Sequence, residues 1–259
     1  MSGIRLIQVP YHLGHEGELI GAGPPVLADA IGGESVVVRR PEGLPNENAA
    51  TFGIVRELAR VVAETVDAGD FPLVLGGNCS TAIGTVTGLE GNVGVVWFDA
   101  HGDLHTPDTS PTGFIDGMAL ALLIGRGWDE LRSGFRAVPA DQVLLVGARD
   151  FDEGEPRDAV TRVDAGSLDD ALAGLDVGSV YVHIDLDVLD PSEGRASGWS
   201  VAGGLTADEL EAALGSIADR FDIPAAAITA YDPRVDPEGR IPPIAARLAS
   251  RLAAAGARS

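Results

Sequence analysis

The 259-residue sequence contains no lysine and a single cysteine, Cys79. Its 18 basic residues are all arginine, so no lysine is available as a nucleophile or for a Schiff base. One cysteine cannot form an internal disulfide, and the N-terminal residues MSGIRLIQVP lack the charged region and long apolar segment of a secretion signal. These absences predict a cytoplasmic protein.

Long apolar runs and positive charge are also scarce. No apolar run approaches the roughly 18 to 20 residues that span a bilayer, so we expect a soluble protein with no membrane partner. The 39 acidic residues give a net charge of −21, which would repel the phosphates of nucleic acids and of anionic membranes. Nucleic acid is therefore excluded as a partner.

Apolar residues make up 45% of the chain, which is enough for a well-buried core. Short apolar runs rich in β-branched residues recur along the sequence. Continuous runs of this kind are typical of strands buried on both faces of a parallel sheet. The seven runs are residues 4–9, 36–38, 72–75, 93–98, 143–146, 180–184 and 225–229.

Segments with helical spacing separate these runs. Residues 48–68 place apolar side chains along one face, and the sequence from Thr206 to Glu209 predicts a capping box that opens a helix reaching about residue 221. The C-terminal residues 241–259 predict an amphipathic helix that covers a core or an interface. The alternation predicts an α/β fold with one doubly wound, mostly parallel sheet. No linker or repeat divides the chain, so we expect a single domain, residues 1–259.

Acidic and imidazole side chains follow the run 93–98 directly, in Asp99-Ala100-His101-Gly102-Asp103. In open α/β sheets, ligands bind beyond the carboxyl ends of the strands. Two carboxylates and an imidazole at this spacing can converge on one cation, and such mixed donors suit Mn²⁺, Fe²⁺ or Zn²⁺. The alternative is a helix N-cap with solvated loop acids.

A second acidic motif, His183-Ile184-Asp185-Leu186-Asp187, follows the run 180–184. Strand alternation predicts that His183, Asp185 and Asp187 point to the same side. Burying several carboxylates together without a cation is costly or forces protonation, so the two motifs jointly favour a bound metal. An aspartyl-nucleophile phosphatase would need a lysine, and an EF-hand would need a glycine and a glutamate that are missing. A sheet protein with purely structural acids remains an alternative.

Five stretches resemble, in order, successive motifs of the arginase, agmatinase and formiminoglutamase (ureohydrolase) superfamily. They are LGGNCSTAIG, WFDAHGDLHTP, GARDFDEGE, HIDLDVLDPS and GGLTADEL. The resemblance covers most of the chain and implies a three-layer α/β/α sandwich with a pair of Mn²⁺ ions. In two-metal hydrolysis, the ions sit about 3.5 to 4 Å apart and share a hydroxide. In the superfamily this hydroxide attacks a guanidinium or formimino carbon, usually with release of urea.

The resemblance also implies roles for the acidic motifs. Asp99 and Asp185 would bridge the two metal ions, and His101 and Asp187 would complete one site. Asp103 would serve the other site and would carry a proton to the leaving amine.

Two motifs depart from the superfamily pattern. The usual Gly-Gly-Asp-His-Ser is Gly-Gly-Asn78-Cys79-Ser80, so Cys79 replaces a histidine ligand. A thiolate is softer than Mn²⁺ prefers and must first lose its proton, so this site is expected to be weak, empty or filled by another divalent ion. Alternatively, Cys79 is simply a small buried residue. The usual His-Gly-Met is Asp116-Gly117-Met118, and Asp116 can move a proton only if its pKa is raised.

The expected substrate pocket is changed as well. Asp152 and Glu155 match positions that recognise an ammonium group in arginases, although they also fit a solvated acidic loop. Ala230 stands where a glutamate usually helps to hold the cationic substrate. Further changes are His105 for asparagine, Thr112 for serine and Trp199 for threonine. His105, Thr112, Asp152 and Glu155 are therefore the candidate substrate-binding residues.

These observations predict a metal-dependent hydrolase that cleaves a C–N bond of a small guanidino or formimino compound resembling an amino acid. An N-hydroxylated guanidine such as N-hydroxyarginine is an alternative substrate, because it is less basic and relies less on the missing glutamate. A second alternative is a catalytically silent family member that keeps one metal ion and acts as a partner or regulator. The resemblance further implies a homo-oligomer, as a trimer, hexamer or dimer.

Overall fold

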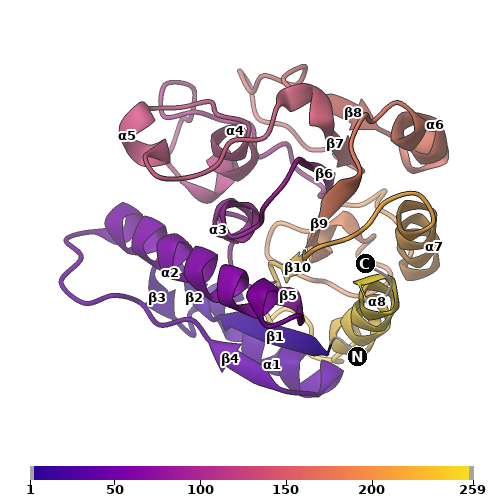
Figure 1. Cartoon of the computed structure of the whole chain (residues 1–259), viewed down its shortest axis with the longest axis horizontal. Coiled ribbons are helices and arrows are strands. Elements are labelled where there is room, and N and C mark those ends of the chain that lie inside the picture. The colour runs from indigo at the N-terminus through magenta and orange to yellow at the C-terminus, as the bar shows by residue number, and fades with distance from the viewer. Residues whose placement is uncertain (1–2, 257–259) are drawn as a thin grey trace.

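The computed structural model describes residues 3–256 and contains one large parallel sheet (Figure 1). Its strands lie in the order β4-β1-β5-β10-β9-β6-β7-β8, and each neighbouring pair is parallel. A short antiparallel pair, β2 and β3, lies outside this sheet. The strands are β1 (Ile4–Val9), β2 (Tyr11–His12), β3 (His15–Glu16), β4 (Ser35–Val37), β5 (Phe71–Gly76), β6 (Val93–Phe98), β7 (Val143–Val146), β8 (Thr161–Val163), β9 (Ser179–Asp185) and β10 (Ala226–Thr229).

Helices cover both faces of the sheet (Figure 1). Helices α2, α3 and α4 pack on one face and contribute to one apolar core, while α1, α6, α7 and α8 contribute to the core on the opposite face. This arrangement confirms the three-layer α/β/α fold. The α-helices are α1 (Gly23–Ile31), α2 (Glu47–Asp67), α3 (Thr81–Thr87), α4 (Ala119–Leu123), α5 (Asp129–Arg132), α6 (Leu168–Ala173), α7 (Ala207–Ala218) and α8 (Ile241–Gly256). Short 3₁₀ turns are η1 (Leu19–Ala22), η2 (Asp116–Met118), η3 (Ala140–Gln142), η4 (Ala165–Ser167) and η5 (Leu186–Val188).

The central strand β6 shows why the strand runs are continuously apolar. All of its residues are buried. Val95 and Trp97 face the core beside α2 and α3, whereas Val96 and Phe98 face the core beside α7 and α8. Because both sides of the sheet are covered, every position of a central strand needs an apolar side chain.

The predicted elements agree closely with the structure. All seven predicted strands are present, and the capping box at Thr206 is formed, with its hydroxyl accepting from the Glu209 amide. Helix α7 ends at Ala218, earlier than predicted. Strand β8 was not predicted, because it has only three residues and two of them are exposed. Helix α8 packs against α1 and α7, so the predicted C-terminal helix covers a core; residues 257–259 lie outside the described part of the chain.

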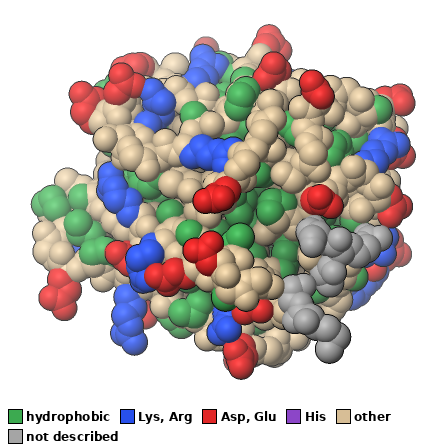
Figure 2. Space-filling view, viewed as in Figure 1, with side chains coloured by type: hydrophobic (Ala, Val, Ile, Leu, Met, Phe, Trp, Pro, Cys, Tyr) green, Lys and Arg blue, Asp and Glu red, His purple; other side chains and the backbone are tan. Residues whose placement is uncertain are grey.

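The surface agrees with the composition. Acidic and arginine side chains are interspersed on the face shown in Figure 2, with apolar side chains visible between them. Within residues 3–256, no helix combines the length and the hydropathy of a membrane span.

Candidate metal centre and pocket

A cavity of about 550 Å³ opens where strands β6 and β9 end. This is the edge of an α/β sheet at which ligands bind. Every residue predicted to belong to the site lines this cavity. They are Cys79, Asp99, His101, Asp103, His105, Thr112, Asp116, Asp152, Glu155, Asp185 and Asp187.

Two groups of side chains in the cavity have the geometry of metal-ligand sets. One contains Cys79, Asp99 and Asp185, and the other contains Asp99, His101 and Asp187. Within each group the ligand atoms lie within 4.8 Å of one another, and Asp99 belongs to both. Neither group includes Asp103, whose side chain lines the same cavity.

The backbone explains how these acids converge. Asp99 directly follows β6, and Asp185 is the last residue of the neighbouring strand β9. Strand β9 ends there, so Asp187 comes from the turn η5 and not from continued strand alternation. The Asp185 carboxylate accepts from the Asp187 amide at 2.8 Å, which closes this turn. His183 lies on the side of β9 that strand alternation predicts, where its ring stacks on Trp97. It is fully buried and does not line the cavity, and the Tyr181 hydroxyl lies 2.9 Å from its Nδ1.

Close packing raises the pKa values of these carboxyl groups. Burial is the largest cause for Asp185, and the charges of Asp187 and Asp99 add to it. Burial and the charge of Asp99 likewise raise the pKa values of Asp103 and Asp187. Ionised forms of these groups therefore repel one another in a site that is shielded from water.

His101 responds in the opposite sense. Burial lowers its pKa, but the hydrogen bond to Asp99 and the charge of Asp187 outweigh burial and raise the pKa to about 9. Its Nδ1 lies 3.4 Å from Asp99 and 3.5 Å from Asp187. The environment around His101 thus stabilises positive charge.

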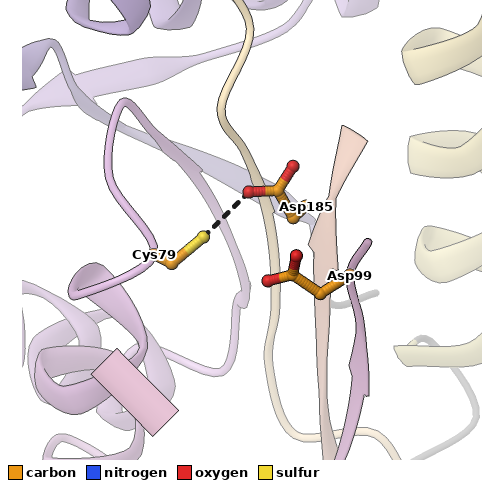
Figure 3. Close-up of side chains that lie close together, drawn as sticks. All are labelled: Cys79, Asp99 and Asp185. Atoms are coloured by element: carbon orange, nitrogen blue, oxygen red, sulfur yellow. Dashed lines mark hydrogen bonds between the residues drawn. The ribbon is translucent and has the colours of Figure 1, made fainter. Parts of the chain in front are cut away.

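The group of Cys79, Asp99 and Asp185 fits a cation less well because of Cys79. Figure 3 shows its sulfur directed at the Asp185 carboxylate, with Asp99 beside them. The thiol donates to Asp185 at 3.0 Å, and burial raises its pKa well above the ordinary value. Cys79 must lose this proton before it can ligate a metal.

The donor chemistry of the group of Asp99, His101 and Asp187 fits a divalent metal. Carboxylate oxygens and one imidazole are the donors that Mn²⁺, Fe²⁺ and Zn²⁺ accept, and a cation between them would remove the repulsion described above. The orientation of Asp99 is also fixed by Trp97, whose indole nitrogen donates to the Asp99 Oδ2 at 2.9 Å. The Trp97 ring is itself stacked on the ring of His183, with the centroids 3.7 Å apart. Such outer hydrogen bonds fix the orientation of metal ligands. Trp97 was predicted only as a core residue, although strand alternation places it on the same side as Asp99.

The predicted substrate-binding residues lie along the loops of the cavity. His105 is buried, with Nε2 3.3 Å from the exposed carboxylate of Asp152. Glu155 accepts from the amides of Leu104 and Asp152, so it holds these two loops together. Thr112 is exposed, and its hydroxyl accepts from the Phe114 amide.

Further residues line the cavity that the motifs did not identify as site residues. They are Ile20, Phe114, Gly117, Asp150 and Phe151. Asp150 lies within the motif GARDFDEGE, and its acidic side chain could have identified it as a candidate site residue. Ile20 and Phe114 had none, because apolar residues in a loop are not distinguishable from core residues by sequence.

The fold and the cavity define the class of protein: an α/β enzyme with a candidate metal centre at the carboxyl edge of its sheet. A family model described as the arginase family matches residues 34–255. The chain is 37% identical over 218 residues to an arginase of Brevibacillus brevis, covering 76% of this chain and 73% of that protein. It is 34% identical to an arginase of Bacillus subtilis over 238 residues, covering 83% and 79% of the two chains.

The solved structures agree with the sequence comparisons. The arginase of Bacillus caldovelox superposes with a TM-score of 0.87 at 30% identity, covering 98% of both chains. The chain therefore belongs to the arginase family, and it is a hydrolase of that family.

Two of the departures from the family pattern contact each other. Asn78 replaces the aspartate of the usual Gly-Gly-Asp-His-Ser motif, and Asp116 replaces the histidine of the usual His-Gly-Met motif. Although the two motifs are far apart in the sequence, the side-chain amide nitrogen of Asn78 donates to the Asp116 carboxylate at 2.6 Å. The Asn78 carbonyl oxygen accepts from the Leu13 amide at 2.9 Å. An aspartate at position 78 could accept from Leu13 but could not donate to Asp116.

Asp116 is further held by the Ser80 amide at 3.0 Å. Burial raises its pKa to about 6, although the hydrogen bonds from Asn78 and from the Ser80 and Cys79 amides lower it. The asparagine at position 78 is therefore the partner that a buried carboxylate at position 116 requires.

We predict that Asn78→Asp lowers the free energy of unfolding of the metal-free protein by about 1 to 3 kcal/mol near neutral pH, because it replaces a buried donor with a second carboxylate. The double variant Asn78→Asp/Asp116→His should recover part of this loss, since a histidine at position 116 can donate to the carboxylate introduced at position 78. Urea denaturation measures both changes.

The matched control is Asn46→Asp. Asn46 caps α2 by accepting from the Ala49 amide, and an aspartate caps a helix equally well, so little change is expected. Equal free energies of unfolding for the Asn78→Asp variant and the wild type would show that the contact between Asn78 and Asp116 contributes little to stability.

Proposed function

We propose that this protein is a metal-dependent hydrolase that cleaves a C–N bond in a small guanidino or formimino compound resembling an amino acid, with release of urea or a urea analogue. The observation that carries the proposal is the pair of ligand groups sharing Asp99 at the floor of a cavity lined by acidic residues. An acidic cavity attracts a cationic guanidinium compound.

We assign the first metal ion to Asp99, His101 and Asp187, with Mn²⁺ as the ion of choice. A second, weaker site is assigned to Cys79, Asp99 and Asp185, with Asp103 beside it. When bound, divalent ions supply a nucleophile by activating water at neutral pH.

The protein's own groups supply the remaining steps. The half-buried side chain of Asp103 lines the cavity, and desolvation together with the Asp99 charge raises its pKa, which favours the protonated form. We assign it the delivery of this proton to the nitrogen of the leaving amine. Asp116 is the second candidate for proton transfer, because its pKa of about 6 lies near the working pH.

The distal part of the substrate is assigned to the loops of the cavity. Asp152 and Glu155 would attract an ammonium group, with His105 and Thr112 offering hydrogen bonds. Ala230 is buried and lines the cavity where the family motif usually carries glutamate. A less basic guanidine, such as an N-hydroxylated one, depends less on that carboxylate and is the favoured variant of the substrate. We also propose a homo-oligomer, as family resemblance implies.

The direct test is turnover. Protein supplied with Mn²⁺, Co²⁺, Ni²⁺ or Zn²⁺ is incubated with a panel of guanidino and formimino compounds, and urea, hydroxyurea and formamide are measured. At least one substrate should give product, and Asp103→Asn should lower kcat by about 100-fold, because it removes the proton donor. Asp208→Asn, on the exposed surface of α7, serves as the control.

Absence of product from every compound and metal would contradict the proposal. If metal ions bind without any product, the catalytically silent alternative, a partner or regulator, takes its place.

Metal content provides a second prediction. The wild type should retain one ion more tightly than the second, because the Cys79 thiol must lose a proton to ligate. Cys79→His should raise the affinity for the second ion at least about tenfold, since a neutral imidazole suits Mn²⁺ better than a thiol. Elemental analysis after dialysis and metal titration measure the content per chain.

Cys79→Ser controls for the loss of the thiol alone, and Asp187→Asn should remove the tightly held ion. An unchanged metal content in both the histidine and the asparagine variants would show that neither ligand group holds metal.

A further inference from the structure

Three aromatic rings meet at the mouth of the cavity. His12 ends β2, Phe114 lies in the loop before η2, and Trp199 lies in the loop after η5. The ring centroids are 6.0 Å apart for His12 and Phe114, 6.3 Å for His12 and Trp199, and 6.1 Å for Phe114 and Trp199. We call these three residues the aromatic wall.

The wall presents an apolar surface to the cavity. Phe114 and Trp199 both line it, and 46% of Trp199 is exposed. His12 packs behind them with its Nδ1 buried and without a hydrogen-bond partner among the described residues. Burial is the main cause that lowers the pKa of His12, so this ring is neutral near pH 7 and adds apolar character.

The wall is fixed relative to the candidate metal centre. The Trp199 amide donates to the Ser197 hydroxyl at 3.0 Å, and that hydroxyl donates to the Asp187 carboxylate at 3.3 Å. On the other side, the Leu13 amide next to His12 donates to Asn78, one residue before Cys79. Two of the three segments that carry the wall, those of Trp199 and His12, are thus tied to the candidate metal ligand Asp187 and to the neighbour of Cys79.

The rings already contact one another at centroid distances typical of aromatic pairs, so a further group does not fit between them. It must pack on their exposed side, which faces the cavity. Ile20 and Ala230 are buried and also line the cavity, so the apolar surface is not restricted to the mouth. The lining also contains acidic side chains, those of Asp150, Asp152 and Glu155.

We propose that the aromatic wall is a binding subsite for an apolar, preferentially aromatic, substituent of a guanidinium compound. The cationic group of the same molecule lies toward the acidic lining and the floor, and its substituent packs against Phe114 and Trp199. The inference rests on the proposed function, whose substrate it narrows to guanidines that carry a hydrophobic tail.

The test compares the binding of two probes, benzylguanidine and methylguanidine, to the full-length protein loaded with Mn²⁺. Isothermal titration calorimetry should show benzylguanidine binding about tenfold more tightly, as expected for the partial burial of one ring. Trp199→Thr should reduce this ratio to about threefold or less, with little change in the affinity for methylguanidine.

Trp128→Thr is the matched control, because Trp128 is 52% exposed and does not line the cavity. It should leave the ratio unchanged. Thermal unfolding verifies that both variants fold, and neither substitution removes a buried side chain.

Turnover adds a readout that a purely structural role would not move. If benzylguanidine is hydrolysed, Trp199→Thr should raise its KM more than it lowers kcat, because the tail contact is equal in the ground state and the transition state. Equal affinities of the two probes, failure of both to bind, or equal effects of the two tryptophan variants would overturn the subsite. The predicted binding ratio, combined with absence of product from every compound and metal of the substrate panel, would contradict the proposed function and leave the subsite standing.

Discussion

Mutual repulsion of buried carboxylates is the constraint on which the rest of this structure depends. Asp99, Asp185 and Asp187 meet at the carboxyl ends of β6 and β9, and Asp103 lies in the same cavity. Their raised pKa values, seen for Asp103, Asp185 and Asp187, reflect burial and one another's charge. A divalent cation removes this repulsion, and it would do so at the position where the fold gathers ligands.

The surrounding residues hold this arrangement in place. Trp97 donates to Asp99 from beneath, and Ser197 donates to Asp187 from the side. The Arg149 guanidinium donates to the carbonyls of Asp187 and Val201 at 2.9 and 2.7 Å, which fixes the loop between them. The same loop carries Trp199 of the aromatic wall, so the geometry of the acids and of the cavity mouth is set together.

Much of the fold could be predicted from the sequence, because a central parallel strand such as β6 is continuously apolar and its boundaries are sharp. The acidic motifs could be placed together, since parallel strands end at one edge. The contact between Asn78 and Asp116 could not, because 38 residues separate them and only the packing of two loops joins them. The aromatic wall could not be predicted either, because its rings come from three distant segments. The turn η5, which changes the direction of the chain at Asp187, was also not predictable from strand alternation.

The most direct test of this account is the effect of Mn²⁺ on thermal stability at two pH values. Excess Mn²⁺ should raise the Tm near pH 7.5 by binding the folded state, and should raise it less near pH 5, because protons compete with the metal for carboxyl groups whose pKa values are raised. Because these carboxyl groups have raised pKa values in the folded state, the metal-free protein is more stable at low pH. It loses this stability as the pH rises through those pKa values. A Tm that Mn²⁺ leaves unchanged at both pH values would contradict the central claim.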